Sequence, residues 1–153
     1  LIVKEMSDMV SLELLSQNLV TGSITLHVGY AYDYHLKPAH GTVTLDMETN
    51  SDSIIIPAVT GLYEKIVAPD KPIRRINITR NHVKPEEYRQ YTFFTDTEKL
   101  EKNRQLQKAV LKIKNKYGKN AILKGMNLQE KSTAIRRNTQ IGGHKSGEEQ
   151  IGK

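Results

Sequence analysis

The two phenylalanines of the chain stand side by side, at Phe93 and Phe94. Two adjacent large rings are costly to leave in water, because each gains about 1.5–3 kcal/mol when it is buried. Gln90 precedes them, with Tyr91 and Thr92 between. The pattern therefore predicts that this peptide docks in a pocket. That pocket would lie either on a partner protein or on the preceding domain of this chain.

Other residue types that often carry chemistry are present without the spacing that the chemistry needs. The five histidines show no paired spacing of metal ligands (His27, His35, His40, His82 and His144), and the chain has no cysteine. Gly142-Gly143 with Lys145 is too short for a phosphate loop, and no serine lies in a nucleophile-elbow context. A small stand-alone enzyme is therefore the weakest interpretation, and no cofactor is expected in this chain.

Charge is distributed unevenly along the chain. Residues 1–83 carry a net charge of −2, whereas residues 84–153 carry +8. A basic half beside a near-neutral half indicates an anionic partner for the tail, most simply nucleic acid, with a solvated basic helix as the alternative. No apolar run approaches the length of a membrane span, and no signal peptide opens the chain, so we expect no membrane contact and a cytoplasmic location. Because the first residue is Leu1 rather than methionine, we expect a piece of a longer protein.

The elements that must position these residues follow from hydrophobic periodicity. Residues 1–18 are predicted to form an amphipathic helix that ends at Asn18. Residues 23–30 and 42–49 alternate between apolar and polar side chains, which predicts two strands covered on one face, joined by a hairpin connection over 33–41. A second helix is expected from the capping cluster at 50–53 to about Val67, with Pro57 tolerated only in its first turn. A third strand is predicted over 73–83.

This order predicts an α+β fold, in which two helices cover one face of an antiparallel sheet and leave the other face polar. The open face would carry short hydrogen-bonding side chains and a guanidinium: Thr25, His27, Thr42, Thr44, Arg75, Asn77 and Thr79. Such a surface suits contacts to phosphate and sugar, although plain solvation is the alternative and Asp46 and Glu48 count against a phosphate.

A basic helical tail is predicted to follow. Residues 96–117 form its main helix, with an apolar stripe of Leu106, Ala109, Val110, Ile113 and Tyr117 and with Gly118 after the last turn. The stripe needs a cover, either on this chain or on a partner. The helical tail is expected to extend to residue 128, and residues 129–153 show almost no periodicity and are predicted to form a flexible basic C-terminus.

In sequence order, several stretches resemble the C-terminal little-finger domain and tail of Y-family translesion DNA polymerases, in the UmuC-like (ImpB/MucB/SamB) branch of Gram-positive bacteria. The resemblance rests on Val3–Val10, Gly22–Tyr30, Ile73–Ile78, Gln90–Phe94, Ile113–Gly125 and Arg137–Lys145. It implies a little-finger domain over 1–83 whose first strand lies before Leu1, and a linker over 84–95. The linker would hold a clamp-binding peptide, Gln90-Tyr91-Thr92-Phe93-Phe94, although Tyr91 and Phe93 stand where leucine is commoner.

The resemblance also implies that catalysis belongs to an upstream palm domain, with its carboxylates and Mg²⁺. Carboxylates of this chain do not replace them, because they are expected on strands and turns without the pairing of a two-metal site (Asp33, Asp46, Glu48 and Asp52). The expected partners are primer-template DNA, the sliding clamp and the upstream polymerase domains.

The sequence therefore favours a non-catalytic region of an error-prone polymerase that acts in DNA repair and the SOS-type damage response. It would grip DNA and tether the enzyme to the clamp. The predicted DNA contacts are Thr25, His27, Arg74, Arg75, Asn77, Thr79, Arg80 and Lys84. One alternative is a replisome adaptor that binds the clamp without gripping DNA. An RNA-binding module is a third possibility, but stacking aromatic residues are missing from the predicted sheet.

Overall fold

The computed structural model describes residues 1–31, 37–69, 71–86, 97–141 and 144–145. Its elements, in chain order, are α1 (Ile2–Ser16), β1 (Leu19–Tyr30), β2 (Ala39–Thr49), α2 (Asp52–Ile66), β3 (Ile73–Asn81), β4 (Lys84–Pro85), α3 (Thr97–Tyr117), a 3₁₀ helix (Gly125–Leu128), α4 (Ala134–Arg137), β5 (Gln140–Ile141) and β6 (His144–Lys145). The predicted helix–strand–strand–helix–strand order over the first half is confirmed.

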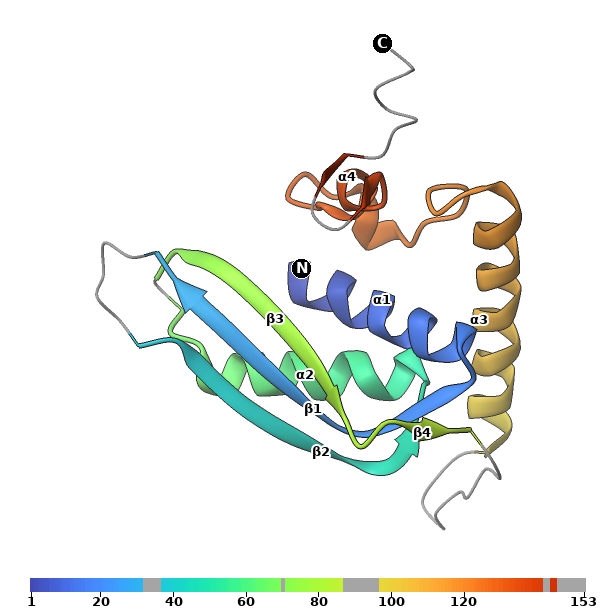
Figure 1. Cartoon of the computed structure of the whole chain (residues 1–153), viewed down its shortest axis with the longest axis horizontal. Coiled ribbons are helices and arrows are strands. Elements are labelled where there is room, and N and C mark those ends of the chain that lie inside the picture. The colour runs from blue at the N-terminus through green and yellow to red at the C-terminus, as the bar shows by residue number, and fades with distance from the viewer. Residues whose placement is uncertain (32–36, 70, 87–96, 142–143, 146–153) are drawn as a thin grey trace.

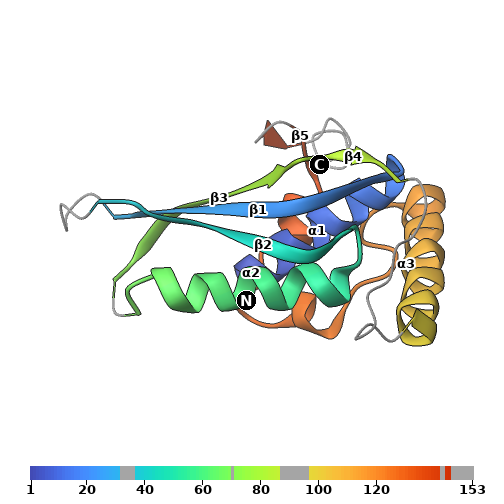
Figure 2. The same ribbon diagram turned by 90° about the horizontal axis from the view of Figure 1, so that it is seen from below.

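The main sheet is antiparallel, with β1 at its centre between β2 and β3. The short β4 extends the sheet at the start of β1, where Leu19 pairs with Pro85 and Val20 with Lys84. Helices α1 and α2 cover one face of this sheet, as Figures 1 and 2 show. The α+β fold with two helices on one face is therefore confirmed.

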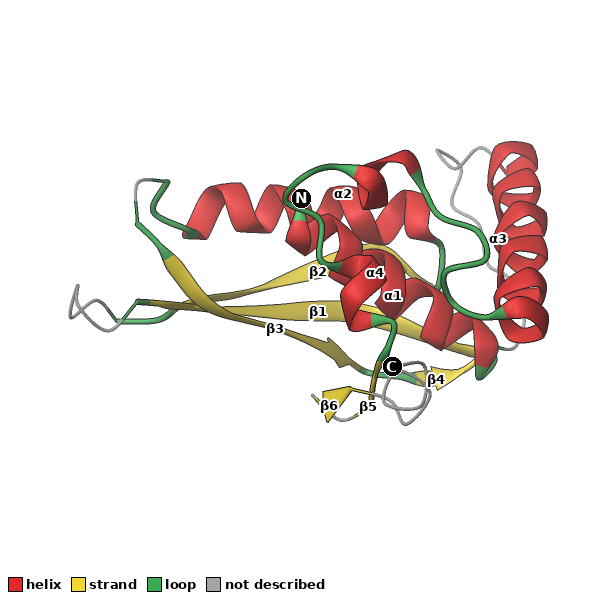
Figure 3. Cartoon of the chain, turned by 90° about the horizontal axis from the view of Figure 1, so that it is seen from above, coloured by secondary structure: helices red, strands yellow, loops and turns green. Residues whose placement is uncertain are grey.

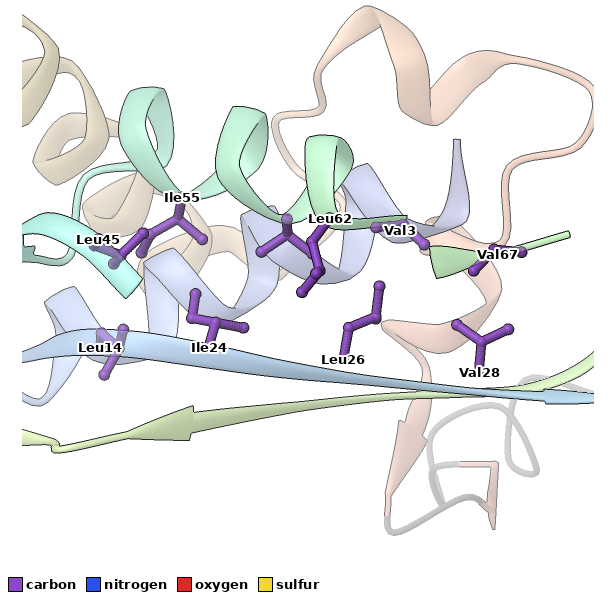
Figure 4. Close-up of a cluster of buried hydrophobic side chains, with 10 residues drawn as sticks. Val3, Leu14, Ile24, Leu26, Val28, Leu45, Ile55, Leu62 and Val67 are labelled. Atoms are coloured by element: carbon purple, nitrogen blue, oxygen red, sulfur yellow. The ribbon is translucent and has the colours of Figure 1, made fainter. Parts of the chain in front are cut away.

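The core lies between the two helices and the covered face of the sheet (Figure 4). Ile24, Leu26 and Val28 supply its centre from β1, and all three are fully buried. Their spacing of two residues directs each of them to the same face, as the alternating sequence predicts. The helices complete the cluster with Val3, Leu14, Ile55, Val59 and Leu62.

Two local features set the helices against the sheet. Asn18, two residues after the end of α1, adopts a positive φ of 55°, a conformation that asparagine tolerates better than most residues, and so the helix stops here as predicted. At Gly41 in β2, an added Cβ would come within 3.1 Å of Leu62 Cδ1 and 3.2 Å of Ile66 Cγ2. The absence of a side chain at Gly41 therefore lets α2 approach β2 closely.

The expectation for Pro57 was wrong. This proline lies inside α2, beyond the first turn of a helix that begins at Asp52. Proline has no backbone N–H, so it cannot donate a hydrogen bond to the carbonyl of Ser53. Ser53 is exposed, and its carbonyl can be satisfied by water, which explains how the helix accommodates the proline.

Helix α3 lies across the end of the sheet, beside the C-terminal end of α1 (Figures 1 and 3). The helix is predicted correctly. The face of α3 that packs against the rest of the domain, however, differs in large part from the predicted apolar stripe. Leu106 and Tyr117 are 63% and 67% exposed, whereas Gln107 is only 4% exposed. The reason is a polar contact with the start of α2, where the Asn103 amide donates to Asp52 Oδ1 at 2.7 Å.

Within the part of the chain that the structure describes, no helix is long and apolar enough to cross a membrane.

Candidate nucleic-acid interface

The uncovered face of the sheet is built from rows of side chains that run across three strands. Register pairs His27 with His40 on one side and with Asn77 on the other. The next row pairs Thr25 with Thr42 and Thr79, and Gly29 lies opposite Arg75. These residues alternate with the buried Ile24, Leu26 and Val28, so the strand pleat itself turns them outward.

Hydrogen bonds fix the threonine row. Thr25 Oγ1 and Thr42 Oγ1 are 2.8 Å apart, and the Asn81 amide donates to Thr25 Oγ1 at 2.8 Å. In the neighbouring row the rings of His27 and His40 stack, with their centroids 5.3 Å apart. Short, mutually held side chains leave little bulk above the backbone, which suits the close approach of an extended ligand such as a nucleic-acid strand.

His40 belongs to this face, although the sequence analysis did not place it there. The predicted strand began at residue 42, whereas β2 begins at Ala39. The signal was available, because His40, Thr42 and Thr44 continue one period-two series in the sequence. The proline at position 38 obscured it by suggesting that the connection ran further.

Arg75 provides a positive charge on this face. Its side chain is exposed, and its partner across the strands is Gly29, which places no side chain beside it. Asn77 and Thr79 follow on the same side of β3 and are also exposed. The structure thus brings together five of the predicted contact residues: Thr25, His27, Arg75, Asn77 and Thr79.

The remaining predicted contact residues lie elsewhere. Arg80 is directed to the helical side, where its Nη1 lies 3.2 Å from Glu13 Oε2 of α1. Arg74 is exposed and lies beside a register shift between β3 and β1. Lys84 belongs to β4, and its Nζ pairs with Glu48 Oε1 at 2.6 Å. Successive side chains of β3 point to opposite faces of the sheet. Because Asn77 and Thr79 point to the open face, Arg80 points to the helical side.

Two carboxylates give the face an electrostatic gradient. Asp46 and Glu48 are exposed near the end of β2, away from the hairpin end at which Arg75 lies. Lys84 neutralises Glu48 in part, and both side chains of that pair are about half exposed. An anionic backbone would therefore be favoured at the Arg75 and His27 end and repelled near Asp46.

A second polar cluster, which the sequence analysis missed, joins α1 to the tail. Glu5 is 1% exposed and accepts hydrogen bonds from the Asn127 amide at 3.2 Å, from the Ser132 hydroxyl and from the Thr133 backbone N–H at 3.3 Å. Arg137 Nη2 lies 3.6 Å from Glu5 Oε2, and burial lowers the pKa of this guanidinium despite the opposing effect of Glu5. The apolar series of this helix, at Val3, Met6, Val10 and Leu14, does not include Glu5.

Lys124 makes the neighbouring contact between the tail and the two helices. Its Nζ lies 2.7 Å from Asp8 Oδ1 and 2.8 Å from Asp52 Oδ2. Burial lowers the pKa of Lys124, but the hydrogen bonds and charges of Asp52 and Asp8 outweigh that effect and raise it. These contacts form one cluster, which we call the tail latch: Glu5, Asp8 and Asp52 with their tail partners Lys124, Asn127, Ser132, Thr133 and Arg137.

The predicted clamp-binding peptide, Gln90–Phe94, lies outside the described residues. The residues that flank it are held: Arg104 of α3 forms a bidentate ion pair with Glu86, with Nη2 3.0 Å from Oε2. The Asn50 amide donates to the same carboxylate at 3.2 Å. Among the described residues, no group of three or more histidine, cysteine, aspartate or glutamate side chains could hold a metal ion.

Comparison with known proteins agrees with this architecture. Residues 1–93 match the model of the impB/mucB/samB family C-terminal domain. Over 145 residues, the chain is 28% identical to UvrX of Bacillus subtilis, a protein named for UV-damage repair. That match spans 95% of this chain and 34% of the relative, so the chain corresponds to about a third of the relative's length. The chain belongs to the impB/mucB/samB family and contains the C-terminal, little-finger type of domain of the UmuC-like Y-family polymerases.

Proposed function

We propose that this region grips primer-template DNA through the open face of the sheet, on behalf of an error-prone translesion polymerase. The observation that carries the proposal is the row structure of that face, in which hydroxyl, amide and imidazole groups lead to the exposed Arg75. These groups supply the phosphate and sugar contacts that set position on a duplex without reading its sequence. Nucleotidyl transfer with Mg²⁺ belongs to the upstream part of the parent protein.

Binding to a labelled duplex at several salt concentrations tests this proposal. Affinity should be similar for unrelated sequences and fall by about 0.9 log units per contacted phosphate for each tenfold rise in salt. Arg75→Ala should weaken binding evenly across sequences and reduce that slope by about 0.9. Lys65→Ala is the matched control, since Lys65 is an exposed cation on the helical side.

The outcomes separate the proposal from its rival. Equal effects of the two substitutions would remove the open face from DNA binding. Salt-independent or undetectable DNA binding, with clamp binding retained, would favour the replisome adaptor instead.

The same proposal includes a tether to the sliding clamp through Gln90–Phe94. Its support is the sequence pattern, together with the anchoring of the flanking Glu86 by Arg104 and Asn50. Replacing Phe93 and Phe94 with alanine should cost clamp binding roughly the burial energy of two side chains, about 3–6 kcal/mol. The melting temperature should change little. A large drop in melting temperature would show that the pair belongs to the core, and retained clamp binding would rule out the tether.

The biological setting that we propose is lesion bypass in DNA repair and the SOS-type response, in the cytoplasm. The family membership of the chain and the relative named for UV-damage repair support this setting.

A further inference from the structure

The C-terminal end of α1 lies beside helix α3, at the end of the domain where β1 begins (Figures 1 and 3). A groove lies between these two helices. Its volume is about 540 Å³, and it is open to solvent along its length. Lys108, Lys112 and Lys116 form one wall, and Asn18 and Asn115 lie beside them. The described lining contains three lysines and no carboxylate.

The spacing of the lysines gives the groove its direction. Residues four apart lie on the same face of a helix, and each step advances about 6 Å, so the three ammonium groups follow a line of about 12 Å along α3. One DNA strand presents a phosphate about every 3.4 Å along the duplex axis. A line of this length therefore matches three or four consecutive phosphates.

The lysine row differs from those cations of the domain that pair with carboxylates. Arg80, Arg104 and Lys124 each pair with carboxylates of α1, α2 or the β4 end. No ion pair joins Lys108, Lys112 or Lys116 to a carboxylate among the described residues, and Lys116 Nζ lies 5.2 Å from the centroid of the Tyr117 ring. Like charges four residues apart destabilise a helix slightly. The row therefore carries an electrostatic cost that an anionic ligand would relieve.

Apart from Leu15 and Leu111, the rest of the lining is polar and suits a phosphate backbone better than a base. Asn18, Asn115 and Ser16 offer amide and hydroxyl groups that can donate to phosphate oxygens. Among the lining residues there is no aromatic ring on which a base could stack. A regularly spaced row of positive charge also fits a linear polyanion better than the irregular surface of an acidic protein.

From these observations we infer that the groove between α1 and α3 is a second DNA-backbone site, separate from the open sheet face. This inference rests on the proposed function, because it adds a second backbone contact to the same DNA-binding domain, at the opposite end of β1 from Arg75. Asn18 directly precedes β1, and the seven residue steps from it to Thr25 correspond to roughly 23 Å of extended chain.

The test compares two charge-matched variants of the full chain on a labelled 20-base-pair duplex. The first carries Lys108→Gln, Lys112→Gln and Lys116→Gln. The second carries Lys4→Gln, Lys65→Gln and Lys102→Gln, which removes three exposed charges outside the groove. Glutamine preserves helix propensity, and far-UV circular dichroism should be the same for both. We expect the groove variant to bind about tenfold or more weakly at 50 mM salt, and its salt slope to fall by about 2.7, at 0.9 per lysine.

A third variant, with arginine at positions 108, 112 and 116, keeps the charge and should retain wild-type affinity. Equal affinity and slope for the two glutamine variants would overturn the second site.

The outcomes also separate this site from the sheet. If Arg75→Ala weakens binding and the groove variant does not, the proposed function stands without the groove. If only the groove variant weakens binding, the lysine site stands and the role of the sheet face fails.

Discussion

The body of the domain, residues 1–86, and the tail, residues 97–141, are held by different kinds of interaction. The body is organised around a cluster of fully buried aliphatic side chains, with Leu26 of β1 near its centre. The described tail contributes few apolar side chains to burial, and Leu106, Tyr117 and Leu128 remain largely exposed. Instead, the tail attaches through the tail latch and through the Arg104–Glu86 pair.

This difference has consequences for stability. Burial of apolar surface is non-directional and cooperative, so loss of one core side chain weakens the whole body. A hydrogen bond contributes only about 0.5–1.5 kcal/mol net, but a buried charge without its partner is costly. The tail should therefore open as a unit of lower stability while the body stays folded. Two substitutions and a change of pH test this contrast, in descending order of expected effect.

Leu26→Ala should have the largest effect. Leu26 is fully buried between β1 and the helices, and removing it leaves a cavity that costs about 2–5 kcal/mol. Urea denaturation followed by circular dichroism measures this loss, and hydrogen exchange should quicken in body and tail together. Leu106→Ala is the matched control, since that leucine is 63% exposed and its loss should change stability by about 0.5 kcal/mol or less. Similar losses for the two variants would contradict an apolar body.

Glu5→Gln should release the tail more than it destabilises the body. The substitution removes the charge that faces Arg137 and replaces one acceptor of the latch with a donor. We expect a cost of about 1–3 kcal/mol. The result should appear as faster hydrogen exchange over 125–137, with little change in β1 and β3.

The control for this substitution is Glu13→Gln, on the same helix. Glu13 is 52% exposed and pairs with Arg80, so its loss should cost about 1 kcal/mol or less and leave the tail protected. If Glu5→Gln unfolded the body and the tail together, the two regions would form one cooperative unit.

The same contrast explains what could be predicted from the sequence. Alternation placed Ile24, Leu26 and Val28 correctly, because apolar burial repeats with the geometry of the strand. Glu5 and Asp8 lie off the apolar stripe of α1, and nothing local indicates that residues 124–137 return to cover them. Ser7 and Ser11 are also buried on this helix. Their hydroxyls donate hydrogen bonds to the carbonyls of Val3 and Ser7, four residues earlier, and so these polar groups are satisfied.

The candidate site divides along similar lines. Strand parity identified Thr25, His27 and Arg75 as outward residues, since a side chain's face follows from its position in the strand. Parity also places Arg80 on the helical side, but charge alone had included it among the DNA contacts. The lysine groove depends on how α3 lies against α1, and that arrangement comes from tertiary contacts that periodicity does not encode.

Raising the pH should produce the smallest effect, through Lys124. Its folded-state pKa is raised above the ordinary lysine value of 10.5, so its ion pairs stabilise the fold fully below pH 10.5. That contribution should be lost as the pH rises further, through the folded-state pKa. The Lys124 side chain is 42% exposed, which limits the effect to about 1 kcal/mol or less.

Urea midpoints from pH 8 to 11.5 measure this loss of stability, with Lys124→Met as the comparison. The difference between wild type and variant should stay constant to about pH 10 and then shrink. Burial and, to a lesser extent, the charge of Lys124 lower the pKa of Lys114, so Lys114 responds to pH in the opposite sense and its response differs between the two proteins. A difference that grew with pH would show that Asp8 and Asp52 do not hold the tail through the charge of Lys124.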